Sequence, residues 1–426
     1  MIPNFCSLVG IVARPYRHWR TSHSCTIYRC AAFTALLAFC SCNSAGTKEK
    51  ITGTHTTKIV SPVTSLPASD SLKFHNAAEG WYDSALRSRG FNGGMIVAKN
   101  GHIVFEAYNS ADNENITDST SLHIASVSKT FTAMAILKLW QDGKLSIDEE
   151  FSKYFPDFNY PGVTIRSMLN HRSGLPNYVY FMEELGWNKK TNITNEDVLL
   201  TLTTRKDELK NIGSPNRGFS YCNTNYALLA LLIEKVSGKK YPGYLQETFF
   251  GPLQMKHTFV YSPADSGRAL LSYDHRGKIP FNFLDVVYGD KNVYSTPRDL
   301  LAWDRALTYN ILFTPQTLAE AYTPYSNEKP GVRNYGLGWR MNLYPTGKKM
   351  IYHNGWWHGN NAAFIRLVED SATIIVLGNK FNRNIYHANK LSNLFGNYFS
   401  QPDAEENEPA PTVVKQKSKR KKTKKK

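Results

Sequence analysis

The chain has 426 residues, of which 42% are hydrophobic and 20% charged, so it can build a core and is not disordered throughout. Its net charge of +16 suggests a nucleic-acid-binding protein, but residues 1–42 contribute +4 and residues 401–426 contribute +5. That leaves +7 for the 358 residues between them, which excludes a strongly basic body. We therefore expect no nucleic-acid partner.

Cysteine is almost confined to the N-terminal end of the chain. Five of the six cysteines lie within the first 42 residues, and Cys222 is the only one in the body. The body therefore has neither a zinc site made of cysteines nor an internal disulfide framework.

The first 42 residues have the order of a secretory signal, because four arginines precede the short apolar run 31–40. Ten apolar residues are too few to span a bilayer, which needs about 20. The residues before Cys42 resemble a relaxed lipobox, so we expect Cys42 to be lipidated and to hold the protein at the cell envelope, facing the periplasm or the outside. Three alternatives stay open: lipidation at Cys40, a signal that is simply cleaved to give a secreted protein, and a start codon downstream of Met1.

The sequence predicts one globular body between two low-complexity segments. Residues 43–74 are rich in Ser, Thr and Pro and are interpreted as a linker, and residues 75–400 form the predicted domain. Residues 401–426 form a Lys-rich tail that we expect to be disordered and solvated; attraction to an anionic surface is the alternative.

The body begins with a predicted β-hairpin, because two apolar runs flank Asn100-Gly101, the dipeptide best suited to a type I′ turn. Two strongly apolar helices follow, and each is ended by a glycine, Gly143 or Gly238. Short strands and a last helix complete the chain. The expected helices are 126–140, 225–236 and 385–399, and the expected strands are 95–99, 102–108, 335–343, 350–353, 362–367 and 372–377. This order predicts an α+β fold: one antiparallel sheet assembled from both ends of the domain, with a helical insertion between.

Ser126 and Lys129 form an S-x-x-K motif at the start of the first apolar helix. Side chains three residues apart on a helix lie on one face, and the helix N-terminus offers N–H groups to a developing oxyanion. The motif also occurs at Ser237, Ser326 and Ser418, but only Ser126 begins a helix that should be buried.

Two further tripeptides have residues suited to catalysis. Tyr221-Cys222-Asn223 directly precedes the second apolar helix, and His353-Asn354-Gly355 follows a short strand. Taken singly, Tyr221 is equally well explained as a half-buried tyrosine, and His353 as a hydrogen-bonded histidine at a strand end.

The order of these three motifs resembles that of the serine β-lactamase and penicillin-binding-protein superfamily, in the branch of class C β-lactamases, D-alanyl-D-alanine carboxypeptidases and esterases. The resemblance covers about residues 75–400 and implies an α/β fold with an antiparallel sheet beside a largely helical region. The segments that carry it are His123–Lys129, Gly143–Asp148, Met168–Pro176, Tyr294–Asp299, Tyr335–Trp339 and Val376–Asn379.

The resemblance implies a role for each motif residue, and no metal or cofactor. Ser126 would be the acylated nucleophile, Lys129 and Tyr221 the proton-handling pair, and Asn223 the partner of a substrate amide. His353, Asn354 and Gly355 would line the substrate site, and the backbone N–H groups of Ser126 and Trp356 would form the oxyanion hole. A lysine with an ordinary pKa of about 10.4 is unprotonated only about once in 2,500 at pH 7. Either burial lowers that pKa or Tyr221 shares the task, so the identity of the base stays open.

Two departures from the family pattern affect the expected substrate. His353 stands where penicillin-recognising members have lysine, and with a pKa near 6.5 it would be charged in only about a quarter of molecules at pH 7. Trp356, Trp357 and His358 follow where smaller residues are common, and the two indoles either narrow the site, form an apolar binding wall or only pack. We expect an envelope-anchored serine hydrolase that acts on D-alanyl peptides of peptidoglycan or on small esters and amides. The alternatives are a non-catalytic peptidoglycan- or penicillin-binding sensor of the same fold, and a β-lactamase acting on β-lactams.

Overall fold

The computed structural model describes residues 64–111, 114–328 and 330–398. The predicted signal peptide, Cys42, most of the linker and the Lys-rich tail lie outside these residues. Helix α1 (Ala68–Ala85) begins inside the range 43–74, so the predicted linker is too long at its C-terminal end. The helix forms there because Phe74, Ala78 and Tyr82, spaced four apart, bury one face of an otherwise polar segment.

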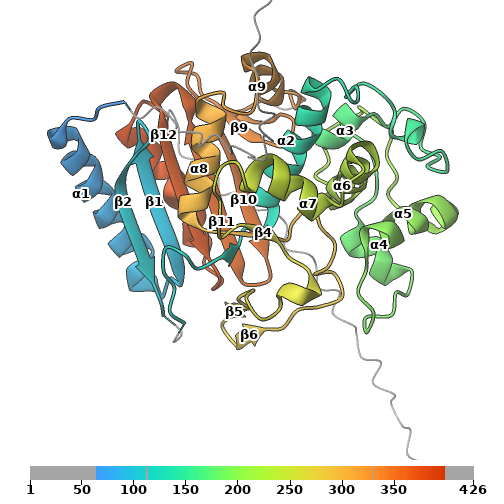
Figure 1. Ribbon diagram of the computed structural model, residues 1–426, viewed down its shortest axis with the longest axis horizontal. Coiled ribbons are helices and arrows are strands. Elements are labelled where there is room, and N and C mark those ends of the chain that lie inside the picture. Colours follow the sequence, from blue (N-terminus) through green and yellow to red (C-terminus); the bar gives the residue numbers. More distant parts are fainter. Residues whose placement is uncertain (1–63, 112–113, 329, 399–426) are drawn as a thin grey trace, which may run out of the picture. The chain divides into compact units, whose positions relative to one another are not determined.

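A seven-stranded antiparallel sheet forms the centre of the described domain, with the strand order β2-β1-β12-β11-β10-β9-β8 (Figure 1). The first hairpin pairs with the last strand, β1 with β12, so both ends of the domain contribute to one sheet as predicted. The strands are β1 (Gly93–Lys99), β2 (His102–Asn109), β8 (Arg333–Tyr335), β9 (Arg340–Leu343), β10 (Lys349–Trp357), β11 (Asn360–Leu367) and β12 (Ala372–Gly378).

The predicted turn between β1 and β2 is confirmed. Asn100 has φ 53° and Gly101 has φ 78°, so both central residues take the left-handed conformation that a type I′ turn requires.

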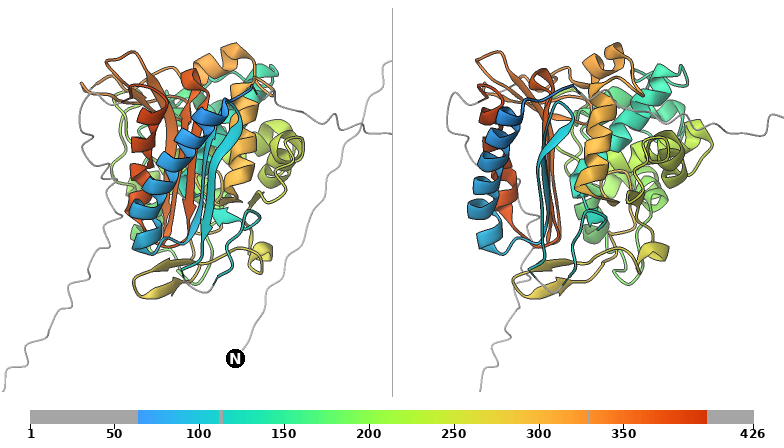
Figure 2. Two further views of the ribbon diagram at one scale, coloured as in Figure 1. Left: turned by 90° about the vertical axis from the view of Figure 1, so that its left-hand side faces the viewer. Right: turned by 60° about the vertical axis from the view of Figure 1, so that its left-hand side comes forward.

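Both faces of the sheet are buried, because helices cover each of them (Figure 2). Helix α1 and the 3₁₀ segment η8 (Arg383–Leu394) cover one face, and α8 (Pro297–Thr308) lies on the other. Successive residues of β12 therefore enter different cores: Ile374 and Val376 pack toward α1, whereas Ile375 and Leu377 pack toward the helical region. The helix expected at 385–399 is this 3₁₀ segment.

The helical region is organised around α2 (Ser128–Gln141) and α6 (Asn223–Ser237), which pack against each other. Gly143 and Gly238, each with φ 70°, follow their C-terminal ends as expected. The remaining elements are α3 (Ile165–Leu169), α4 (Tyr178–Glu184), α5 (Asn195–Thr204), α7 (Tyr241–Leu245), α9 (Pro315–Ala321), β3 (Leu122–His123), β4 (Phe259–Val260), β5 (Ser272–Asp274), β6 (Gly277–Ile279) and β7 (Val293–Ser295). Within the described ranges no helix combines the length and apolarity needed to cross a membrane.

Candidate active site

Ser126 lies in a 3₁₀ turn, Ala125–Val127, that leads directly into α2. The helix was expected to begin at Ser126, and its α-helical part begins two residues later. Ala125 has φ 47°, a strained conformation for a residue with a Cβ atom, and its N–H donates to Nδ1 of His123 at 3.1 Å. This turn leaves Ser126 partly exposed between buried neighbours.

Lys129 is fully buried on the first turn of α2. Its Nζ donates to Oγ of Ser126 at 3.0 Å and to the main-chain oxygen of Asp290 at 2.7 Å. The expected side-chain reach across the S-x-x-K motif is therefore observed. Ser237, by contrast, is the last residue of α6, and the lysine three positions after it, Lys240, pairs with Glu234 at 3.0 Å.

Tyr221 lies near the side chains of Lys129 and Arg340. Nζ of Lys129 is 5.0 Å from the centre of its ring, and Cζ of Arg340 is 5.1 Å from it. His171, at φ 58°, packs its ring 4.3 Å from that of Tyr221 and accepts a hydrogen bond from the N–H of Cys222 at 3.1 Å. The buried imidazole therefore fixes the backbone that presents Tyr221 beside Lys129.

Asn223 is the first residue of α6. Its Oδ1 is buried and has no hydrogen-bond partner within the described part of the chain. Because a buried amide oxygen without a partner is costly, this atom is suited to receive a donor from a bound molecule.

The edge of β10 passes directly beside the turn that carries Ser126. Strand β9 pairs with β10 only over 349–352, and β10 continues to Trp357. A Cβ atom at Gly355 would lie 2.3 Å from the oxygen of Ile124 and 3.1 Å from the nitrogen of Ser126. Only glycine allows this approach, which brings β10 to the nucleophile.

The expectation that His353 titrates near pH 6.5 is wrong. The residue is fully buried, and its Nδ1 and Nε2 lie 2.7 Å from the oxygen of Asn354 and 3.2 Å from the hydroxyl of Tyr335. Burial lowers the pKa of His353 well below its usual range, and the charge of Arg340 lowers it further. The imidazole is neutral at pH 7, and its ring centre lies 6.4 Å from that of Tyr221.

The three large residues after Gly355 have different environments. Trp357 donates from Nε1 to Oδ1 of Asp285 at 2.5 Å, and Nε2 of His358 lies 3.0 Å from the same carboxylate. For Trp357 this contact favours the alternative that the indole packs. Trp356 is partly exposed and lies next to Asn354, which is 9% exposed.

The electrostatics of the site combine the amine of Lys129 and the guanidinium of Arg340 with neutral imidazoles. Burial lowers the pKa of His123 to about 4 and that of His171 well below its ordinary value, so neither is charged at pH 7. His171, Asp290 and Arg340 are parts of the site to which the sequence analysis gave no role. Two positions offered a signal: His171 lies within the segment Met168–Pro176 that carries the resemblance, and Arg340 directly follows the segment Tyr335–Trp339.

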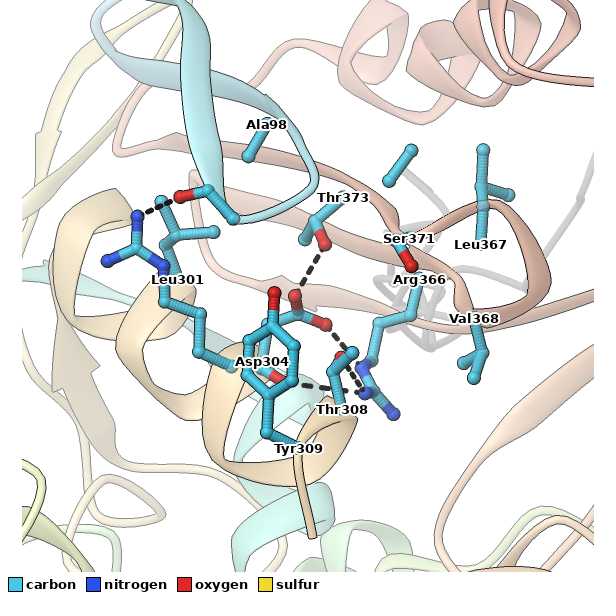
Figure 3. Close-up of a pocket in the computed structure, with 13 residues that line it drawn as sticks. Ala98, Leu301, Asp304, Thr308, Tyr309, Arg366, Leu367, Val368, Ser371 and Thr373 are labelled. Carbon is cyan, nitrogen blue, oxygen red and sulfur yellow. Dashed lines mark hydrogen bonds and ion pairs between the residues drawn. The ribbon is translucent and has the colours of Figure 1, made fainter. Parts of the chain in front are cut away.

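A small hollow lies elsewhere, against the end of α8 and the turn between β11 and β12 (Figure 3). Asp304, Arg366 and Ser371 are among the residues that line it. Gly355 on β10 pairs with Ala362 on β11, which in turn pairs with Leu377 on β12. Ala372, which lines the hollow, lies five residues before Leu377 on the same strand. Five residues of strand span roughly 17 Å, so the hollow lies at the opposite end of the sheet from Ser126.

Comparison with known proteins gives consistent results. The β-lactamase family model matches residues 79–393. Penicillin-binding protein 4* of Bacillus subtilis (strain 168) is 30% identical over 334 residues, which cover 73% of this chain and 73% of that protein.

Two solved structures show the same fold at lower sequence identity. The octameric penicillin-binding protein homologue from Pyrococcus abyssi aligns with a TM-score of 0.64 at 22% identity, over 74% of this chain and 75% of that one. D-amino acid amidase from Ochrobactrum anthropi SV3 aligns with a TM-score of 0.60 at 24% identity, over 76% of this chain and 97% of that one. The predicted fold class, an antiparallel sheet flanked by helices, is confirmed. The chain belongs to the β-lactamase family, within the superfamily of serine β-lactamases and penicillin-binding proteins.

Proposed function

We propose that this protein is a serine hydrolase that forms an acyl-enzyme on Ser126 and acts on D-alanyl peptides or related small amides and esters. The observation that carries the proposal is the 3.0 Å hydrogen bond between Nζ of the buried Lys129 and Oγ of Ser126. A serine hydroxyl becomes an effective nucleophile when a neighbouring group takes its proton. Lys129 and Tyr221 are the two candidates for that group.

The surroundings of Ser126 support an amide substrate that carries a carboxylate. The buried Oδ1 of Asn223 would accept a hydrogen bond from a substrate amide N–H. The guanidinium of Arg340, 5.1 Å from the ring centre of Tyr221, supplies a positive charge that the neutral His353 does not. A peptide with a free C-terminal carboxylate fits both features, whereas a β-lactamase activity would lack the charged lysine of the penicillin-recognising members.

The names of two similar proteins agree with this choice. One is a penicillin-binding protein and another is a D-amino acid amidase. Both names denote ligands built on amide bonds, and they favour a D-amino acid amide over a simple ester.

Labelling with a fluorescent fluorophosphonate tests the nucleophile. The wild-type protein should be labelled and Ser126→Ala should not, because the reagent forms its covalent bond only with an activated serine. Ser237→Ala provides the matched control, since Ser237 is the serine of another S-x-x-K motif, and it should be labelled like the wild type. Equal labelling of wild type and Ser126→Ala contradicts the assignment, and a wild-type protein that is not labelled favours the non-catalytic sensor.

A substrate panel then tests the class of reaction. We expect turnover of a D-Ala-D-Ala peptide and of short-chain esters, and little turnover of a chromogenic cephalosporin. Rapid hydrolysis of the cephalosporin alone would favour the β-lactamase alternative.

We further propose that the protein is held at the cell envelope through a lipid on Cys42. The support is the arginine-led apolar run 31–40 followed by Ser41. Stable attachment needs more than one acyl chain, or one chain and a basic patch. The variant Cys42→Ser should move the protein from the membrane fraction to the soluble fraction and lower its mass, and an unchanged mass contradicts lipidation.

A further inference from the structure

A second buried lysine lies close to the catalytic pair and has no part in the proposed reaction. Lys291 follows Asp290, whose main-chain oxygen holds Nζ of Lys129. The side chains of Lys291 and Asp290 are 3% and 1% exposed, and Nζ of Lys291 lies 3.4 Å from Oδ2 of Asp290. The hydroxyl of Tyr178 donates to the same Oδ2 at 3.0 Å, and Nζ of Lys291 in turn donates to Tyr178.

The backbone around this pair is held rigidly against the helices. Gly289 has φ 93°, and a Cβ atom there would lie 2.4 Å from the oxygen of Tyr226 on α6. Thr132 of α2 donates to the oxygen of Gly289 at 2.6 Å. On the other side, Asn292 has φ 75° and donates from Nδ2 to the oxygens of Asp285 and Val287 at 2.6 and 2.7 Å. The carbonyl of Asp290 therefore has little freedom to move away from Lys129.

The carboxylate of Asp290 is a negative charge on the residue whose main-chain oxygen accepts a hydrogen bond from Lys129, one of the two candidates for the base. Uncompensated, that charge would favour the protonated form of Lys129 and oppose its use as a base. The ammonium of Lys291 offsets it, and Nζ of Lys291 also lies 4.8 Å from the ring centre of Trp357. Oδ1 of Asp290 is buried with no hydrogen-bond partner among the residues described, so the carboxylate depends on Lys291 and Tyr178.

We propose that Asp290 and Lys291 form a charge-compensated support that positions Lys129 and sets the pH above which Ser126 reacts. Both are positioning residues, because they act on the serine through Lys129. The inference rests on the proposed function of Ser126.

Several other titratable groups face this cluster from neighbouring elements. They are Tyr178 on α4, Tyr221 and Cys222 before α6, Tyr226 on α6, Tyr241 on α7, His171 after α3, His123 on β3, Arg340 on β9, His353 on β10, His358 after β10, and Asp285. Burial and the charge of Asp290 raise the pKa of Tyr178 well above its usual value. Burial lowers the pKa of His123, His171 and His353, so these three stay neutral between pH 6 and 9. The remaining groups are the same in all variants compared below.

The test measures how fast the fluorescent fluorophosphonate labels Ser126 in the full chain between pH 6 and 9. This probe reports activation of the serine whatever the physiological substrate is. In Lys291→Met the carboxylate loses its counter-charge, so the pH midpoint of labelling should rise by roughly one unit. In Asp290→Asn the lysine charge is left alone, and the midpoint should fall by a similar amount. The double variant Asp290→Asn/Lys291→Met should return close to the wild-type midpoint.

Opposite shifts in the two single variants distinguish this role from a purely structural one, which would slow labelling without moving the midpoint. Lys291→Arg keeps the charge and should keep the midpoint. Lys138→Met removes the charge of another α2 lysine, paired with Asp142, and should not shift it either.

Unshifted midpoints, or shifts in the same direction, overturn the inference while leaving the proposed function intact. If Lys291→Met does not fold, the isosteric Asp290→Asn decides alone, and a midpoint that stays or rises overturns it. A wild-type protein that is not labelled overturns the proposed function and this inference with it.

Discussion

Two buried ion pairs of the described domain are built differently: one lies at the end of the seven-stranded sheet far from Ser126, and the other lies in the loop before β7, next to Lys129. At the end far from Ser126, Nε of Arg366 donates to Oδ1 of Asp304 at 2.6 Å (Figure 3). The other carboxylate oxygen accepts from Thr373 at 2.6 Å, and the guanidinium also donates to Thr308 at 3.0 Å and to Tyr322. Both carboxylate oxygens and all three guanidinium nitrogens therefore have partners.

The pair near Lys129, Asp290 and Lys291, has fewer hydrogen bonds than the Arg366 pair. Asp290 and Lys291 are 3.4 Å apart, and Oδ1 of Asp290 has no partner in the described structure. A fully hydrogen-bonded buried pair fixes one arrangement, whereas a partly satisfied one stays sensitive to the charge of its neighbours. The contacts of the Arg366 pair suit a role in the fold, whereas the Asp290 pair is the one that we infer to act on Lys129.

Breaking the complete pair should produce the largest effect on stability. Arg366→Met leaves the Asp304 carboxylate buried without its cation, which costs about 3–5 kcal/mol of unfolding free energy. Urea unfolding measures this loss. The molecules that remain folded should react with the fluorophosphonate at the wild-type rate, because the pair lies at the far end of the sheet.

An exposed pair supplies the control for that experiment. Arg276 pairs with Asp274 at 3.1 Å and its side chain is 79% exposed, so Arg276→Met should cost less than about 0.5 kcal/mol. Equal losses in Arg276→Met and Arg366→Met would contradict the structural role of the buried pair.

Acid should destabilise the region around Ser126, because the buried histidines 123, 171 and 353 lie there. The pKa of His123 is lowered by burial to about 4, against about 6.5 in an unfolded chain. Between these values the unfolded state binds a proton that the folded state does not. The stability that the neutral imidazole contributes is complete above pH 6.5, and about 3 kcal/mol of it is lost as the pH falls to 4.

Urea unfolding of wild type and His123→Gln between pH 4.5 and 7.5 measures this effect. The variant should lose stability on acidification with a slope smaller by nearly one proton. A slope equal to that of the wild type would show that His123 does not titrate in this way.

The substitution Gly355→Ala tests how closely β10 must approach the turn that carries Ser126. Alanine there would place Cβ 2.3 Å from the oxygen of Ile124, so either β10 or the Ser126 turn must shift. A displacement of this kind costs on the order of a hundredfold in rate. Gly355→Ala should therefore react with the fluorophosphonate about a hundredfold more slowly than the wild type.

Gly80→Ala is the matched substitution in open space, because a Cβ atom at this position on α1 would have no neighbour within 4 Å. It should raise the unfolding free energy by roughly 0.5–1 kcal/mol and leave the labelling rate unchanged. Wild-type reactivity in Gly355→Ala would show that the close approach is not needed.

Local features of the fold and site were predictable from the sequence. The turn at Asn100-Gly101, the glycines that end α2 and α6, and the reach of Lys129 to Ser126 all depend on residues a few positions apart. Helix α1 was missed because only Phe74, Ala78 and Tyr82 interrupt a polar segment that continues the low-complexity composition before it.

Contacts between distant parts of the chain were not predictable in the same way. Lys129 meets the carbonyl of Asp290 across 161 residues, and a main-chain oxygen has no signature in the sequence. The neutral state of His353 follows from its burial beside Tyr335 and from the charge of Arg340, which come from other strands. The residue type alone predicted an ordinary histidine pKa for His353, and the burial that the fold imposes lowers it.

Arg340 is a second arginine on the same sheet as Arg366, and its substitution should have the smallest effect of those considered. Arg366 is enclosed by its partners, whereas Arg340 is partly exposed and lies 5.1 Å from the ring centre of Tyr221. If Arg340 binds the carboxylate of a substrate, Arg340→Gln removes one charge-assisted hydrogen bond, worth roughly a tenfold change in kcat/KM. Hydrolysis of a D-Ala-D-Ala peptide should fall by about that factor, while hydrolysis of a neutral ester should stay nearly constant. Parallel losses on both substrates would place Arg340 with Arg366, as a structural arginine rather than one that selects the substrate.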